Sequence, residues 1–182
     1  MKNIVLVGLF ALIMPNLFGQ KYFTQNGTIS FYSEAKLEDI ESTNSQVSSV
    51  IDLENGKVAF SLLMKAFTFE KALMQTHFNE KYVESELYPK ATLIGKIDNL
   101  ANKEITNEPQ EFTIAGNLTI HGETREVVTK GTLYFNEKGQ LIADSKFEIL
   151  LSDYQIKIPS AVKDNLSETI LIKIHIEYEK MD

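Results

Sequence analysis

The strongest constraint on this sequence is a regular alternation of apolar and polar side chains in several long runs. Near the C-terminus every second residue from Ile170 to Tyr178 is apolar or aromatic, and Lys173, His175 and Glu177 lie between them. Comparable runs cover 28–32, 58–64, 112–120 and 141–151. A period of two predicts β-strands with one buried and one solvated face, which is typical of antiparallel sheets.

Short turn sequences separate these runs, at Asn26-Gly27, Glu54-Asn55-Gly56, His121-Gly122-Glu123 and Asn136–Gly139. Gly and Asn supply the positive φ that tight hairpins need. With the run at 90–100 we count about eight strands, several of them ten or more residues long. Long antiparallel strands favour closure, because a closed barrel has no unpaired edge. The sequence therefore predicts a mainly all-β fold, an eight-stranded antiparallel barrel.

One segment, between Phe69 and Tyr82, breaks the alternation. Its apolar residues follow i, i+4 spacings, as in Phe69, Leu73 and His77, and in Met74 and Phe78. This spacing predicts a short helix near one mouth of the barrel. A smaller helix or ordered loop is expected between 152 and 166, where Pro159 stops any regular element. We interpret the polar run at 36–49 as a surface loop or an irregular edge.

Residues 1–20 have the features of a secretory signal peptide. A positively charged start at Lys2 precedes an apolar run from Ile4 to Met14, and Gly19-Gln20 offers a small-residue cleavage point. The alternative is a buried core helix. The run is shorter than the ~20 residues that span a bilayer, and no other segment approaches that length. We expect an exported, soluble protein, periplasmic or secreted, whose mature chain, 21–182, is one barrel domain without a transmembrane span.

Charge and cysteine content exclude several classes of function. The 182 residues include 18 Lys and Arg against 25 Asp and Glu, for a formal net charge of −7, which argues against nucleic-acid binding. The absence of Cys removes disulfides, thiolate nucleophiles, Cys-ligated zinc and lipidation on Cys. A barrel of this kind must be stabilised by its core and its strand pairing alone.

Catalytic and metal-binding patterns are weak. His77 and Glu80 could present two ligands on one helical face, but no further ligands follow at a recognisable spacing, and we predict no metal site. The sequence has no Gly-x-Ser-x-Gly elbow and no Gly-rich phosphate loop. We therefore predict no catalytic residues, no cofactor and no enzymatic activity.

The aromatic content is more informative, because eleven Phe and seven Tyr are a large supply for one small domain. Many of them fall on the predicted inward face. An eight-stranded barrel can be filled by such side chains or can hold one small ligand. Inward Gly116, Ala143 and Ser145 would leave space at some levels, either for complementary packing or for a cavity. Periodicity alone leaves both readings open.

Several stretches resemble the YceI-like polyisoprenoid-binding family, which has a lipocalin-like barrel. They are Phe67-Thr68-Phe69, the predicted helix up to His77-Phe78, Tyr88-Pro89-Lys90-Ala91, the run from Phe112 to Gly122 with Arg125 and Val127, Phe147 to Tyr154, and the last strand. The pattern Gly-x-Leu-Thr-Ile-x-Gly, here Gly116 to Gly122, is the family's most recognisable motif. Family members often carry Arg-Asp-x-His-Leu on the helix, whereas here His77 stands in a changed setting, between Thr76 and Phe78.

This resemblance implies that a long apolar molecule, an isoprenoid or another amphiphilic lipid, binds inside the barrel without catalysis. We expect Phe67, Phe69, Leu73, Met74 and Phe78 to form a mobile wall at the mouth. The complete set of expected ligand-binding residues is Phe31, Phe60, Leu62, Phe67, Phe69, Leu73, Met74, His77, Phe78, Phe112, Ile114, Leu118, Leu133, Phe135, Phe147, Ile149, Tyr154, Ile172 and Ile174.

Two other functions remain as alternatives. One is a filled-core barrel that acts as an envelope stress or adhesion module. The other is a hydrolase on the same scaffold that uses His77 and Glu80. The sequence also leaves a homodimer open.

Overall fold

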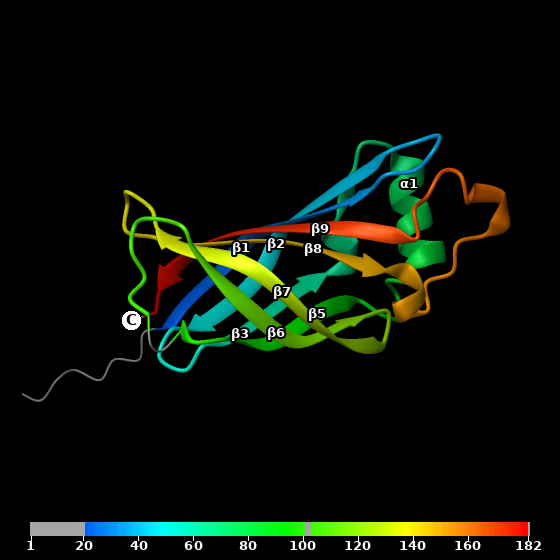
Figure 1. Ribbon diagram of the computed structural model, residues 1–182. Coiled ribbons are helices and arrows are strands. Elements are labelled where there is room, and N and C mark those ends of the chain that lie inside the picture. Colours follow the sequence, from blue (N-terminus) through cyan, green and yellow to red (C-terminus); the bar gives the residue numbers. More distant parts are fainter. Residues whose placement is uncertain (1–20, 101–102, 182) are drawn as a thin grey trace, which may run out of the picture.

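Eight long antiparallel strands form a closed barrel in the computed structural model, which describes residues 21–100 and 103–181 (Figure 1). The predicted signal peptide, 1–20, lies outside the described residues. The strands are β1 (Lys21–Ser33), β2 (Ile40–Asp52), β3 (Lys57–Leu63), β5 (Lys90–Ile97), β6 (Gln110–Ile120), β7 (Glu123–Phe135), β8 (Leu141–Leu150) and β9 (Thr169–Lys180). Their order is β1-β9-β8-β7-β6-β5-β3-β2, and pairing of β1 with β2 closes the barrel. The predicted barrel is confirmed.

The segment that breaks the alternation is helical, as predicted. Helix α1 (Ala72–His77) continues into a π-helical turn, η2 (Phe78–Tyr82), and both lie across one end of the barrel (Figure 1). A two-residue strand, β4 (Thr68–Phe69), pairs with β2 just before the helix. The expected ordered region at 152–166 contains the 3₁₀ turns η4 (Leu151–Tyr154) and η5 (Ser160–Val162), and a further 3₁₀ turn, η1 (Met64–Ala66), follows β3. None of the described helices is long and apolar enough to cross a membrane.

The interpretation of 36–49 as a loop or irregular edge holds for 36–39 but was wrong for 40–49, because regular strand β2 begins at Ile40. Its inward side chains include Ser42, Asn44 and Ser49, which are buried and satisfy their polar atoms internally. The Asn44 amide donates to the Leu63 carbonyl at 2.9 Å, and the Ser42 hydroxyl donates to the Thr68 carbonyl at 2.8 Å. A strand whose buried face is polar has the same period but lacks the hydrophobic signal.

Asn26-Gly27 is also not a turn, since β1 runs through it with an irregular register between Thr24 and Ile29. Gly27 packs closely against the buried end of the Ile176 side chain, which disfavours a larger residue. A Cβ at this position would lie 2.3 Å from the Cδ1 of Ile176. The other three turn predictions are confirmed, with Gly56, Gly122 and Gly139 at φ values of 74°, 77° and 75°.

The barrel has two differently packed halves along its axis. The half near Lys21 and Met181, called here the packed half, is filled by buried side chains that include Ile51, Phe112, Leu133, Leu141, Ile176 and Tyr178. Along β6 the packed half ends at Gly116, whose Cβ would lie 2.8 Å from the Cα of Gly95. Gly116 therefore allows the backbones of β5 and β6 to approach closely, and it does not leave the space in the barrel that the sequence suggested. The half beneath α1 is called here the hollow half.

Candidate functional site

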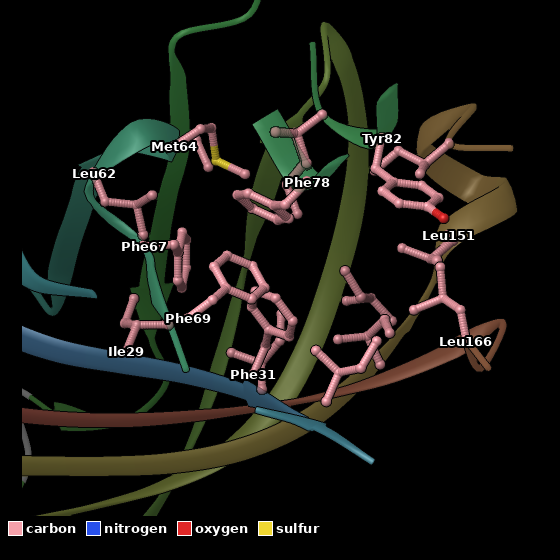
Figure 2. Close-up of a pocket in the computed structure, with 18 of the residues that line it drawn as sticks. Ile29, Phe31, Leu62, Met64, Phe67, Phe69, Phe78, Tyr82, Leu151 and Leu166 are labelled. Carbon is pink, nitrogen blue, oxygen red and sulfur yellow. The ribbon is translucent and has the colours of Figure 1, made fainter. Parts of the chain in front are cut away.

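The hollow half encloses a cavity of about 390 Å³, which is within the size range of small-molecule sites. Its wall is overwhelmingly apolar and is built by the barrel strands, by α1 and η2, and by the segment after β8 (Figure 2). Inward residues come from the ends of the strands nearest α1, such as Leu62 on β3, Leu118 on β6 and Ile172 on β9. The arrangement suits an apolar ligand.

Four phenylalanines form one cluster against this cavity. Phe31 lies on β1, Phe67 and Phe69 lie on the segment through β4, and Phe78 is the first residue after α1 (Figure 2). The ring centroids of Phe69 and Phe78 are 5.0 Å apart, and those of Phe31 and Phe67 are 5.3 Å apart. Aromatic pairs at such distances contribute roughly 0.5–1.5 kcal/mol beyond the area that they bury. The cluster therefore holds the helical segment against the barrel.

Thirteen of the nineteen residues expected to bind a ligand line this cavity: Phe31, Phe60, Leu62, Phe67, Phe69, Met74, His77, Phe78, Leu118, Phe147, Ile149, Ile172 and Ile174. The other six lie elsewhere. Phe112, Ile114, Leu133 and Phe135 belong to the packed half. Tyr154 is buried in η4 outside the cavity, and the side chain of Leu73 faces solvent. Ala143 and Ser145 do not line the cavity either.

Sequence reasoning missed further lining residues, among them Ile29, Glu38, Ile40, Met64, Tyr82, Leu93, Ile120, Leu151, Asn165 and Leu166. Ile29 and Ile120 continue alternations already recognised, so the same period could have found them. Ile40 opens the polar strand β2, and Asn165 and Leu166 lie in an irregular segment. No periodicity connects such positions to the barrel interior.

Polar groups are few in the cavity wall and lie mainly at the mouth. Glu38, His77, Tyr82 and Asn165 supply a carboxylate, an imidazole, a phenol and an amide. The Lys71 ammonium donates to Glu38 at 2.6 Å, and this contact raises the pKa of Lys71. The lining residues include no Lys or Arg. The wall therefore offers hydrogen bonds to a ligand but no cation.

Hydrogen bonds of His121 form a node that joins three segments at the hollow end of the barrel. The ring of His121 contacts the Tyr154 carbonyl through Nδ1 at 3.0 Å and the Glu84 carboxylate through Nε2 at 2.8 Å. The ring is therefore held from both sides, by a backbone carbonyl and by a side-chain carboxylate. Glu84, His121 and Gln155 all have positive φ, between 45° and 55°. Three strained residues thus meet where η2, the β6–β7 turn and η4 join.

The described residues hold no group of three His, Cys, Asp or Glu that could act together as metal ligands. His77 lines the cavity, whereas Glu80 lines a separate groove beside Lys65 and Glu86. His175 lies on the outer face of β9, where the Asp144 carboxylate at 2.7 Å raises its pKa. That contact is on the surface, away from the cavity.

Comparison with known proteins yields one family and several solved structures. The model of the YceI-like domain matches residues 22–178. A polyisoprenoid binding domain from Saccharophagus degradans, implicated in plant cell wall breakdown, superposes with a TM-score of 0.77 at 14% identity, over 90% of this chain and 99% of that one.

BcnA of Burkholderia cenocepacia gives a TM-score of 0.70 at 15% identity, over 84% of this chain and 96% of that one. A mutant YceI protein of Campylobacter jejuni gives 0.58 at 18% identity, over 82% and 89%. No curated protein matches the sequence.

Proposed function

Because this chain belongs to the YceI-like family, as its sequence motifs predicted, we propose that it holds the apolar chain of an isoprenoid or a similar amphiphile inside the hollow half of its barrel. The observation that carries the proposal is the cavity of about 390 Å³ with an almost wholly apolar wall. Burial of a hydrocarbon chain there gains about 25 cal/mol per Å² of apolar surface removed from water. The polyisoprenoid binding domain of Saccharophagus degradans has the same fold.

The volume limits how much of a chain fits. At ~30 Å³ for a water-sized group, the cavity accommodates roughly a dozen chain atoms. A longer isoprenoid would extend through the mouth, past His77 and Tyr82. We expect little discrimination among chains of similar thickness, because the wall has few directional contacts.

The mouth favours an uncharged head group. A diphosphate at the mouth would meet the Glu38 carboxylate, and the Lys71 ammonium beside it is already paired with that carboxylate. A buried anion without a cationic partner is costly. A hydroxyl or carbonyl head could instead bond with Tyr82, His77 or Asn165. Farnesol should therefore bind more tightly than farnesyl diphosphate.

The proposal includes export through residues 1–20, delivery to a periplasmic or extracellular compartment, and binding without catalysis. Mass spectrometry under native conditions, on protein purified from the cells that export it, tests both parts. The expected result is a mature mass lacking the first 19 or 20 residues, with a hydrophobic molecule attached. A consistently clean protein mass would favour the filled-core alternative, an envelope stress or adhesion module.

Two neighbouring helix positions give a matched pair of variants. Met74 lines the cavity, while the adjacent Leu73 faces solvent on the same helix. Met74→Asp should lower equilibrium affinity for farnesol about tenfold, because a short carboxylate would enter an apolar wall. Leu73→Asp should leave that affinity unchanged. Equal effects of the two variants would contradict the assignment of the cavity as the binding site.

A further inference from the structure

Two exposed leucines stand directly beside residues that line the cavity mouth. Leu37 is 72% exposed and precedes Glu38, and Leu73 is 65% exposed and precedes Met74. Neither side chain packs against the core. Single exposed apolar residues are common on protein surfaces, but two leucines beside an apolar opening extend its apolar surface outward.

The two leucines, called here the rim leucines, are held in one rim by polar contacts. The Lys71 ammonium on the α1 side bonds to Glu38 at 2.6 Å, and the Leu37 amide donates to the Asp164 carbonyl at 3.0 Å. The β1–β2 tip, α1 and the η5 segment consequently surround the same end of the barrel (Figure 1). The rim leucines are thus fixed relative to the cavity mouth.

The two lysines that lie closest in sequence to the rim leucines both form ion pairs, and Asp39 and Glu70 nearby are exposed carboxylates. Lys71 pairs with Glu38, and Lys36 pairs with Asp164 at 3.2 Å. The rim therefore lacks the unpaired basic cluster that recruits proteins to anionic lipids. Its attraction for a partner comes from the leucines, and a neutral lipid surface is the partner that fits an apolar rim around an apolar mouth.

We propose that the rim leucines enter the interface of a lipid bilayer and place the cavity mouth against it, so that a chain passes between bilayer and cavity with little exposure to water. This inference rests on the proposed lipid binding. It assigns Leu37 and Leu73 a role in exchange with a membrane, and it predicts no role for them in equilibrium affinity.

The barrel provides a matched control for exposed apolar surface. Ile94 on β5 and Val128 on β7 are 69% and 67% exposed, on the outer wall away from the mouth. The rim variant is Leu37→Gln with Leu73→Gln, where Gln keeps the helix propensity of α1. The control variant is Ile94→Thr with Val128→Thr, where Thr keeps the strand propensity.

The test measures flotation with phosphatidylcholine vesicles, together with the transfer rate of fluorescently labelled farnesol from loaded protein to those vesicles. The unsubstituted protein and the control variant should float with the vesicles, and this binding should persist in 1 M salt, where surface charge is screened to ~3 Å. The rim variant should bind vesicles at least tenfold less and transfer the probe about tenfold more slowly.

Several results would overturn the membrane role. They are an unsubstituted protein that does not float, binding that disappears in salt, or a control variant as impaired as the rim variant. Equilibrium affinity for farnesol without vesicles separates this inference from the proposed function. A rim variant with normal affinity for farnesol and slow transfer supports the inference. An unsubstituted protein that does not bind farnesol would instead contradict the proposed function itself.

Discussion

The packed half and the hollow half of this barrel are built from the same eight strands with the same alternation, yet only one of them is filled. On β9, Ile176 and Tyr178 are almost fully buried in the packed half, while Ile172 and Ile174 line the cavity. Buried side chains therefore occur in both halves, but those of the hollow half, such as Leu62, Leu118 and Ile149, border the space for a ligand. Substitutions in the two halves should have different consequences.

The largest expected difference is between two inward isoleucines of β9. Ile176→Ala should lower the free energy of unfolding by about 3–4 kcal/mol, because the removed atoms leave a cavity that the surrounding side chains fill only in part. Ile174→Ala, two residues away, should cost about 1 kcal/mol, since one side of that residue already faces empty space. Urea unfolding of both variants measures the difference, and equal losses would contradict the division into halves.

A second prediction concerns the contact of Gly27 with Ile176 in the packed half. Gly27→Ala should destabilise the protein by about 2 kcal/mol, because the new Cβ would overlap the Ile176 Cδ1. Ile176→Val removes that atom and should recover part of the loss in the double variant. A double-mutant cycle from denaturant unfolding measures this coupling. Strictly additive effects would show that the close approach is not what selects glycine.

The packed half should also make the protein sensitive to alkaline pH. Burial raises the pKa of Tyr178 well above its ordinary value of 10.0. The neutral phenol is therefore favoured in the folded state, and its contribution is fully present below pH 10 and is lost as pH rises towards the folded pKa. Stability should fall by about 1.4 kcal/mol per pH unit above the unfolded pKa.

Tyr178→Phe is the control for this pH dependence. The variant loses the 2.7 Å hydrogen bond between the Tyr178 and Ser49 hydroxyls, so it should be less stable at neutral pH. Its stability should nevertheless decline less steeply above pH 10. The two stability–pH profiles come from chemical unfolding at a series of pH values, and parallel profiles would remove Tyr178 as the cause.

The smallest predicted effect concerns the His121 node at the hollow end of the barrel. His121→Asn keeps a residue type that tolerates positive φ but loses the contacts with Tyr154 and Glu84. We expect a loss of about 1 kcal/mol and faster hydrogen exchange in η2 and η4, with β9 near Tyr178 unchanged. Faster exchange throughout the barrel would mean that the node supports both halves.

The sequence predicts the walls of this barrel better than its interior. Alternation correctly places Phe112 and Phe147 on the inward face, but one fills the packed half and the other lines the cavity. That difference depends on side chains across the barrel, and periodicity within one strand contains no such information. The first half of strand β2 was missed for another reason, because Asn44 and Ser42 direct hydrogen-bonding groups instead of apolar surface to the interior.

The site is less predictable at its mouth than along the strands. Glu38 and Asn165 lie in irregular segments and become neighbours of the cavity only through tertiary folding. Leu73 differs in the opposite way. It was expected at the cavity from its i, i+4 spacing with Phe69 and His77, but its side chain points outward. A six-residue helix at the edge of a cavity buries only a narrow stripe, and the spacing alone does not determine which stripe it is.

Pairing of β1 with β9 brings the first and last described strands together, and the Met181 amide donates to the Lys21 carbonyl at 2.9 Å. Both ends of the described chain consequently lie at the packed half, far from α1 (Figure 1). A short linker could join residues 181 and 21, with new termini opened in the turn at Asn136–Gly139. A fluorophore, a fusion partner or attachment to a solid support at either end would leave the opening at the opposite pole unobstructed.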